Sequence, residues 1–259
     1  MIDVVRVTQH YGMRPVLRDL SLQVAKGELL AVLGPNGMGK TTLLSVMAGV
    51  LSPQHGHVEI NGRRRRATIE DELAIRAQVS YLADHPWLPK WRTGREFALE
   101  VGRLYSVDED RLLAHAEDLF QLFGLKDEAN WPLHSYSNGQ KHKAAICATL
   151  IAETPVMILD EPFSGGLDPA GILALRRILK HLVTHCGRTV VLSAPVPELL
   201  EELADRIAIV RDGQLVALDT PAALRESFGG GCSLSDALQH LIHPQTVASL
   251  ESYLGRMSQ

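Results

Sequence analysis

The residues of this 259-residue chain whose types and spacing could do chemistry begin with a glycine-rich run near the N-terminus. The run has the spacing G-x-x-x-x-G-K-[ST], which is typical of loops that bind phosphate groups. Its glycines let consecutive backbone N–H groups turn towards an anion, and a helix after the loop adds the positive end of its dipole. Lys40, solvated while the site is empty, is expected to reach the outer phosphates of a nucleotide, and the Thr41 hydroxyl to ligate Mg²⁺. The residues that we expect to hold the phosphates are Gly34, Pro35, Asn36, Gly37, Met38, Gly39, Lys40, Thr41 and Thr42.

Two neighbouring carboxylates form the second reactive group. Asp160 and Glu161 follow the apolar run VMIL, which is expected to be a buried strand. At the carboxyl end of such a strand, Asp160 would face a metal ion and Glu161 would activate a water molecule. Taken alone, the pattern also fits a core strand that ends in two solvated acids. Because the phosphate loop is present, we predict Asp160 as a metal ligand and Glu161 as a catalytic base.

The elements that must position these groups alternate between strands and helices. A continuous apolar run over residues 29–33 predicts a strand buried on both faces, and residues 43–49 predict the helix after the phosphate loop. Further along, strands alternate with helices, one of them predicted over residues 197–204, and IAIVRDGQLVAL predicts a hairpin that turns at Asp212 and Gly213. This alternation predicts an α/β fold with a mostly parallel sheet.

The segment from about residue 86 to 151 interrupts this alternation and has helical patterns. Thr93 and Glu96 have the spacing of a capping box that opens one helix, and Gly124 is placed to end a second. We therefore expect one domain over residues 1–228, with a helical subdomain inserted at 86–151. Residues 229–259 are expected to form a short helical C-terminal extension.

Composition limits the classes of function. A hydrophobic content of 46% and a charged content of 22% are the ordinary balance of a globular protein. The formal net charge of −4 argues against a nucleic-acid binder. No apolar run approaches the roughly 18 residues needed to cross a bilayer. Because no such run is present, a membrane connection is expected to come through a partner. Cys147 lies in an apolar stretch and is expected to be a buried, reduced thiol in a cytosolic protein.

Between the phosphate loop and the acidic strand lies the segment SYSNGQK, residues 135–141. It resembles the signature segment of ATP-binding cassette (ABC) ATPases, whose usual form is Leu-Ser-Gly-Gly-Gln. The resemblance covers residues 1–228 and includes the phosphate loop, the run ILDEP and the run LDP that ends at Pro169. Tyr11 lies at the family's adenine-stacking position. The resemblance implies a P-loop NTPase core with a mostly parallel sheet, an N-terminal antiparallel β subdomain and an inserted helical signature subdomain.

The resemblance also implies how such a chain works. In this family two cassettes enclose two ATP molecules with Mg²⁺, and each site joins one chain's phosphate loop and acidic strand to the other chain's signature. Ser137, Gly139 and Gln140 would then contact the ATP that the partner holds. The implied partners are a second ABC ATPase subunit, as a homodimer or heterodimer, and an integral membrane permease on a separate chain. The chain would lie in the cytoplasm, held on the inner face of the cell membrane through that permease.

Four positions depart from the family's pattern. Asn138 replaces a glycine, and asparagine is the residue besides glycine that best accepts a left-handed backbone. Asp84 replaces a glutamine, and we predict it as a catalytic residue and a shorter Mg²⁺ ligand. The segment 164–168 is one glycine longer than the usual form. Pro195 replaces a histidine, and because proline offers no side-chain donor or acceptor, hydrolysis at this chain's own loop is expected to be slow.

Three functions stay open at this point. The chain could be the ATP-hydrolysing subunit of a transporter, resembling export-type systems, that powers a separate permease. It could instead be a regulatory subunit that binds ATP, hydrolyses little of it and donates its signature to a competent partner. A soluble ABC protein that acts on ribosomes or DNA fits less well, because the chain is acidic and has a single cassette.

Other features carry less weight. Arg63 to Arg66 favour a solvated hairpin end over a lipid contact. His181 and His185 stand one helical turn apart without a third metal ligand. Trp87 and Trp91 fit a permease contact and core aromatics equally well. The C-terminal tail fits a dimer contact or a helix packed on its own domain.

Overall fold

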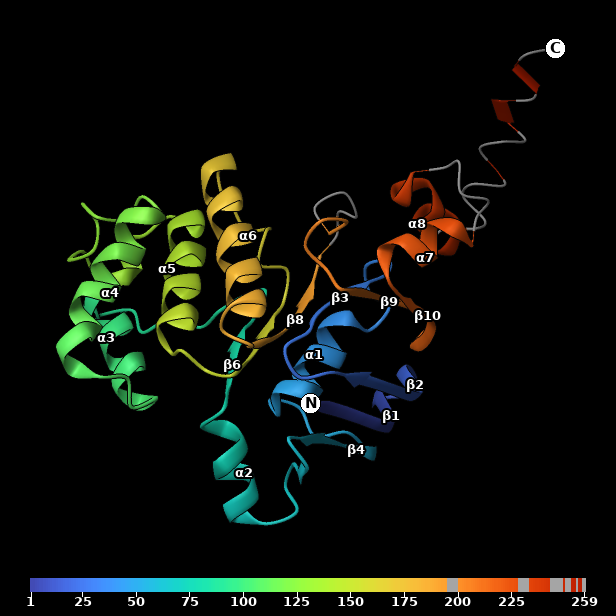
Figure 1. Ribbon diagram of the computed structural model, residues 1–259, viewed down its shortest axis with the longest axis horizontal. Coiled ribbons are helices and arrows are strands. Elements are labelled where there is room, and N and C mark those ends of the chain that lie inside the picture. Colours follow the sequence, from blue (N-terminus) through green and yellow to red (C-terminus); the bar gives the residue numbers. More distant parts are fainter. Residues whose placement is uncertain (195–199, 228–232, 243–248, 250–252, 255, 258–259) are drawn as a thin grey trace.

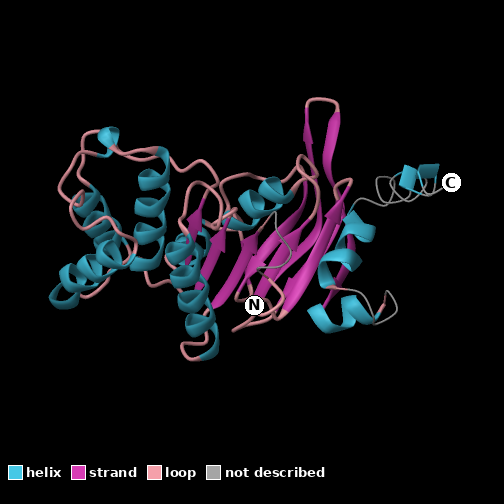
Figure 2. Ribbon diagram, turned by 90° about the horizontal axis from the view of Figure 1, so that it is seen from above, coloured by secondary structure: helices cyan, strands magenta, loops and turns pink. Residues whose placement is uncertain are grey.

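The computed structural model describes residues 1–194, 200–227, 233–242, 249, 253–254 and 256–257. Within these residues the strands gather in one half of the molecule, while a group of helices without strands occupies the other half (Figure 2). The strands form a four-stranded sheet in the order β2-β1-β4-β5 and a six-stranded sheet in the order β10-β9-β3-β8-β7-β6.

The four-stranded sheet is antiparallel and begins at the N-terminus. Its strands are β1 (Ile2–Tyr11), β2 (Arg14–Val24), β4 (His55–Ile60) and β5 (Arg63–Arg64). Leu20, Leu22 and Val24 alternate with exposed residues and are buried, since successive side chains of a strand point to opposite faces. The predicted antiparallel β layer is confirmed.

The predicted phosphate loop and the predicted carboxylates follow strands of the six-stranded sheet. Its strands are β3 (Leu29–Leu33), β6 (Val79–Leu82), β7 (Val156–Leu159), β8 (Thr189–Ser193), β9 (Arg206–Arg211) and β10 (Gln214–Asp219). All neighbours are parallel except β10, which returns antiparallel to β9 through the predicted turn at Asp212 and Gly213. Every residue of β3, β7 and β8 is buried, because helices or the other sheet cover both faces. The predicted α/β fold with a mostly parallel sheet is confirmed.

Several helices pack against this sheet (Figure 1). Helix α1 (Lys40–Ala48) lies between the two sheets, where it contacts β2 on one side and β6, β7 and β8 on the other. Helix α6 (Pro169–Thr184) contacts β8, and the short α7 (Pro221–Glu226) contacts α8 (Leu234–Ile242). Helix α1 ends at Gly49 in a left-handed conformation, as its sequence predicted.

The helical group consists of α3 (Gly94–Leu104), α4 (Glu109–Leu122) and α5 (Asn138–Ile151), which pack on one another. The capping box predicted from Thr93 and Glu96 is formed, and Gly124 follows α4 with a φ of 66°. Cys147 lies on α5 and is a buried, free thiol, as expected. Burial raises the pKa of this thiol well above its usual range.

The structure differs from the sequence analysis at two helices. Helix α2 (Ile69–Arg76) was not predicted, although Thr68 caps it by accepting a hydrogen bond from the Asp71 N–H at the T-x-x-D spacing. The helix predicted over 197–204 is not seen in its described part, because residues 200–203 form a turn. Residues 195–199, with Pro195 among them, lie outside the described residues. No helix in the described part of the chain is long and apolar enough to span a bilayer.

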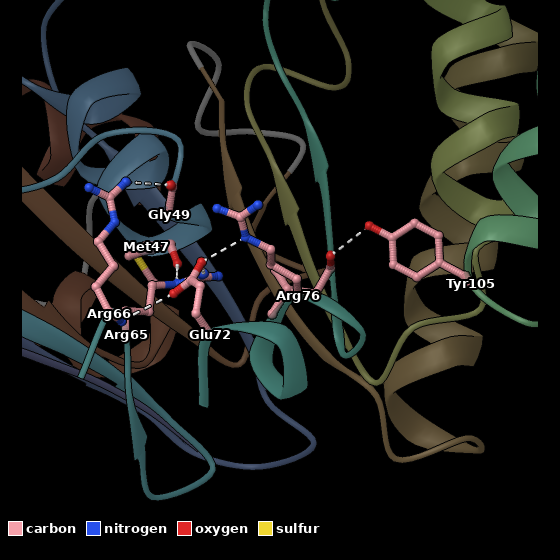
Figure 3. A network of polar contacts seen from close by, with 8 residues as sticks. Met47, Gly49, Arg65, Arg66, Glu72, Arg76 and Tyr105 are labelled. Atoms are coloured by element: carbon pink, nitrogen blue, oxygen red, sulfur yellow. Dashed lines mark hydrogen bonds and ion pairs between the residues drawn. The ribbon is translucent and has the colours of Figure 1, made fainter. Parts of the chain in front are cut away.

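The interpretation of Arg63 to Arg66 as a solvated hairpin end is wrong for Arg65, whose side chain is 5% exposed. Figure 3 shows its contacts: Nε donates to the carbonyl of Met47 (2.9 Å), and Nη1 donates to Glu72 Oε1 (3.1 Å). Arg66 donates in the same way to the carbonyl of Gly49 (3.0 Å). The last carbonyls of a helix lack partners within it and carry its negative dipole end, so cations are drawn to them. Arg65 and Arg66 therefore anchor the C-terminal end of α1.

Candidate functional site

The phosphate loop lies between the end of β3 and the start of α1, and its backbone requires glycine. Gly37 and Gly39 have φ values of 77° and 103°, in the left-handed region that side chains disfavour. A Cβ on Gly34 would lie 2.0 Å from the carbonyl oxygen of Val210, and one on Gly39 would lie 2.8 Å from that of Val16. At Gly34 and Gly39 the loop thus lies so close to neighbouring backbone that a side chain would not fit.

Lys40 is not solvated as the sequence suggested, because the residue is only 5% exposed. Its Nζ donates to the carbonyl oxygens of Gly34 (2.8 Å) and Pro35 (3.2 Å), so the loop itself supplies acceptors. Burial lowers the pKa of the Lys40 ammonium, and the negative charges of Glu161 and Asp160 oppose this effect. The lysine is therefore positioned in advance, close to both predicted carboxylates.

The other predicted phosphate contacts follow in order around the loop. Asn36 and Gly37 are exposed at its tip, and Met38 is partly buried. At the first turn of α1, Thr41 is exposed while Thr42 is buried. Of the two threonines, Thr41, the predicted Mg²⁺ ligand, is thus the one that solvent reaches.

Asp160 is fully buried at the end of β7. Its Oδ1 accepts a hydrogen bond from Ser193 Oγ (2.7 Å), whereas Oδ2 is buried without a hydrogen-bond partner among the described residues. An unpaired carboxylate oxygen in the protein interior is costly, so its position implies a ligand that satisfies it. A hard oxygen donor of this kind is what Mg²⁺ prefers, and the arrangement fits the ion expected from the sequence.

Glu161 has a φ of 49°, which is rare for a residue with a long side chain. Its backbone N–H donates to Ser193 Oγ (2.8 Å), and its Oε2 accepts from Ser164 Oγ (3.1 Å). Such a conformation costs of order 1–3 kcal/mol and persists because the surroundings enforce it. The strain lies at the residue predicted as the catalytic base.

Ser193 was not predicted, yet it binds both acidic residues. It ends β8, which lies between β3 and β7 in the sheet, so its hydroxyl lies between the phosphate loop and the acids. The carboxyl ends of parallel strands meet at one edge, which is where α/β proteins bind ligands. A polar residue that closes the apolar run TVVL was the available signal.

Asp84 and Tyr11 are less constrained. Asp84 follows β6 at the same edge of the sheet, and its side chain is 39% exposed, with His85 Nε2 at 3.7 Å from Oδ2. Tyr11 ends β1 and is 57% exposed. Within the described residues, neither side chain forms a hydrogen bond that would fix its position.

The signature residues lie at the start of α5, which packs with α3 and α4 (Figure 1). Ser137 is the N-cap: its Oγ accepts from the Gln140 N–H (3.2 Å), and Gln140 Oε1 accepts from the Ser137 N–H (2.9 Å). Gln140 also donates to Glu128 Oε1 (3.1 Å). Its side chain is therefore already engaged in the protein.

The argument that Asn138 serves a left-handed backbone is wrong. Asn138 is the first residue of α5 and does not have a positive φ. Because Ser137 caps a right-handed helix at this point, any residue with ordinary helical geometry can follow. Gly139 behaves differently, since a Cβ there would lie 3.2 Å from the carbonyl oxygen of Gly166.

Comparison with known proteins decides the family. The family model described as "ABC transporter" matches residues 17–164, more than half of the chain. The chain belongs to the ABC transporter ATPase family. Daunorubicin resistance ATP-binding protein DrrA3 of Streptomyces coeruleorubidus is 35% identical over 229 residues, which are 88% of this chain and 71% of that protein.

Solved ABC cassettes have the same fold. A structure described as the ATP-binding subunit of an ABC transporter has a TM-score of 0.84 at 29% identity, over 93% of this chain and 99% of that one. A dimeric post-hydrolysis state of the cassette MJ0796 with ADP and Pi has a TM-score of 0.77 at 24% identity, over 85% and 98% of the two chains. As an ABC ATPase cassette, the chain is the ATP-binding subunit of a transporter and uses ATP with Mg²⁺.

Proposed function

We propose that this ABC cassette hydrolyses MgATP and couples ATP-driven closure of a dimer to a separate integral membrane permease. The observation that carries the proposal is the separation of two incomplete half-sites on one chain. Lys40, Asp160 and Glu161 converge at the edge of the six-stranded sheet, whereas Ser137 is presented at the start of α5 in the helical group. A second cassette would bring a signature to each phosphate loop.

Each residue at the sheet edge has an assigned part in this proposal. Lys40 would exchange the carbonyl oxygens of Gly34 and Pro35 for phosphate oxygens, which bear more negative charge and bind it more strongly. Glu161 would accept the proton of the attacking water. Hydrogen bonds with Ser164 and Ser193 would hold Glu161 in place. When bound, Mg²⁺ would offset the phosphate charge. The oxygen ligands that we assign to it are those of Thr41, Asp160 and Asp84.

The remaining contacts complete the ATP site. The phosphate loop from Gly34 to Thr42 would surround the phosphates, and the exposed ring of Tyr11 would stack on the base. Ser137 and Gly139 would bind the terminal phosphate of the ATP held by the second cassette. Gln140 would act there through the cap that it forms with Ser137, because its side chain is occupied.

A permease surface is supported by the three tryptophans of the chain, all of which are exposed. Trp87 and Trp91 are 83% and 82% exposed and follow Asp84, and Trp131 is 52% exposed on the neighbouring loop. The loops are joined by hydrogen bonds, such as that from the His134 N–H to the Lys90 carbonyl (3.0 Å). Tryptophans are enriched at the energetic centres of protein interfaces. The interpretation of Trp87 and Trp91 as core aromatics is wrong, since both are exposed.

Location and assembly follow from the same proposal. The chain would lie in the cytoplasm against its permease and would pair with a second cassette, by analogy with MJ0796, whose solved structure is described as dimeric. We assign residues 1–228 to the cassette, with the helical subdomain at about 86–151, and residues 229–259 to a separate extension. No nucleic-acid partner is proposed.

A second function is favoured by one feature of the sequence. Pro195 occupies the position of the family's histidine, so a donor to the terminal phosphate is missing. Loss of one such preorganised group typically lowers the rate by roughly 10²–10³-fold. In the alternative, the chain binds ATP, closes the dimer and donates Ser137 to a competent partner, while its own site turns over slowly.

Purification of the complex through a tag on this chain tests the main proposal. We expect a membrane permease to co-purify, with ATPase activity that Glu161→Gln removes. Absence of any membrane protein, or turnover that Glu161→Gln leaves unchanged, would refute it. Pro195→His then separates the alternatives, because a rise in ATP turnover above that of the parent identifies an impaired site. Full-strength turnover at both sites of the parent complex would reject the regulatory function.

A further inference from the structure

One face of the N-terminal half of α5 contacts the segment that follows Glu161. Gly139, His142 and Lys143 have the i, i+3, i+4 spacing that places side chains on one face of a helix. All three contact residues 162–168: Gly139 meets Gly166 through the backbone, His142 meets Pro162, and Lys143 Nζ pairs with Asp168 Oδ1 (3.2 Å). The signature and the exit of β7 are therefore in direct contact within one chain.

His142 is the buried member of this face, at 3% exposure. Its Nε2 lies 3.1 Å from the carbonyl oxygen of Pro162, which directly follows Glu161. Because a carbonyl can only accept, Nε2 carries the proton and donates this bond. A buried carbonyl deprived of its donor is destabilised by roughly 1–3 kcal/mol, so the contact constrains the backbone next to the catalytic residue.

The extra glycine of this chain matches the histidine. A Cβ on Gly165 would lie 2.7 Å from Cγ of His142, closer than real Cβ atoms approach, and Gly165 has a φ of 74°. The imidazole ring therefore lies against the Cα of Gly165, where any side chain would displace it. The long 164–168 segment and His142 are complementary features of one packing arrangement.

We propose that His142 is a positioning residue that makes the signature turn and the Glu161 segment move as one body. The inference rests on the proposed function, because it links the half-site around Glu161, which would act on this chain's own ATP, to the half-site at Ser137, which would act on the ATP of the second cassette. ATP held at the sheet edge would act on Glu161, and through Pro162 and His142 on the helix that presents Ser137. A purely structural core histidine would stabilise the fold without linking these two segments.

Two substitutions separate the hydrogen bond from the packing. His142→Leu fills similar space without a donor, and His142→Gln keeps a donor. With the full chain and its permease, we expect His142→Leu to lower kcat by roughly tenfold, with KM for ATP and ATP affinity unchanged, because the phosphate loop is untouched. His142→Gln should restore kcat to near the parent, and Gly165→Ala should resemble His142→Leu. His181→Leu, on the exposed face of α6, is the matched control.

Amide hydrogen exchange provides a readout that does not depend on turnover. In the parent chain, MgATP should protect residues 161–168 and the first turn of α5 together, and in His142→Leu it should protect only residues 161–168. Parallel protection in His142→Leu, or a kcat equal to that of the parent, would overturn the inference. So would an equal defect in His142→Gln and His142→Leu. A parent complex without ATPase activity would instead refute the proposed function, and the exchange result would still decide the role of His142.

Discussion

The end of β7 and the start of α5 both carry residues that we assign to ATP binding, but the two regions differ in how well their polar groups are hydrogen-bonded. At the end of β7, Asp160 Oδ2 is buried without a hydrogen-bond partner among the described residues, and Glu161 has a left-handed backbone. At the start of α5, Ser137 and Gln140 satisfy each other in a capping box and have ordinary conformations. The first region stores unfavourable energy that a ligand could relieve, whereas the second is stable by itself.

This difference shows that a residue suited to binding a ligand can lower the stability of the protein without that ligand. A region that binds a cation must keep carboxylates in a protein interior, and this is costly until the cation arrives. A region that offers a hydroxyl and a glycine to another chain's ATP has no charge to bury. We therefore expect substitutions at the two regions to change stability in opposite directions, even where both abolish turnover.

The largest effect is expected from Glu161→Gln. General-base catalysis contributes typically 10²–10⁴-fold, so kcat of the complex should fall by about 10³-fold while ATP still binds. The amide can still accept the hydrogen bond from Ser164, so the loop should keep its shape. ATPase assays combined with light scattering should show a dimer that persists in MgATP. A dimer that dissociates as fast as the parent's would contradict the assignment, and Ser164→Ala serves as a milder control.

Lys40→Ala is expected to weaken MgATP binding by roughly 10–100-fold, the range that corresponds to losing hydrogen bonds to charged groups. The carbonyl oxygens of Gly34 and Pro35 also lose their donor, so the loop should become less ordered without nucleotide. Titration calorimetry with the exposed Lys126→Ala as control measures this. Equal affinity in the parent and Lys40→Ala would show that the loop does not hold the phosphates.

Glu72→Gln should destabilise the protein by about 2 kcal/mol, because Arg65 would be left buried without a carboxylate. In a chain of this length that corresponds to a fall in Tm of roughly 4–8 °C. Thermal denaturation with the exposed Glu70→Gln on the same helix as control tests it. An unchanged Tm in Glu72→Gln would mean that the hydrogen bond to the Met47 carbonyl is enough to hold Arg65.

The smallest effects compare the two regions directly. Glu161→Asn should raise stability by about 0.5–1 kcal/mol, since asparagine adopts a positive φ more readily than glutamate, and Glu161→Ala controls for loss of the carboxylate. Ser137→Ala should lower stability by about 1 kcal/mol through loss of the helix cap. Denaturant midpoints measure both. Destabilisation by Glu161→Asn would show that the strain at β7 is absent.

Most of the fold, and the residues that we assign to the ATP phosphates, could be predicted from short-range patterns. The apolar runs of β3 and β7 and the glycine spacing before Lys40 are local signals, because buried strands and phosphate loops need particular residues in sequence. Ser193 and His142 could not be found in this way. Each acts on residues 20 or more positions away, and a single serine or histidine in a sequence does not say what it will face in the fold.

The sequence by itself determined the family and the α/β alternation, and it predicted the residues of the phosphate loop, since these depend on neighbours along the chain. Only the tertiary structure decided that Lys40 is buried on its own loop, that Arg65 anchors α1, and that Asn138 begins a helix. The same holds for the contact of His142 with the residue after Glu161. Burial and hydrogen bonding depend on which distant segments meet, and parallel strands and packed helices bring together residues that no local pattern connects.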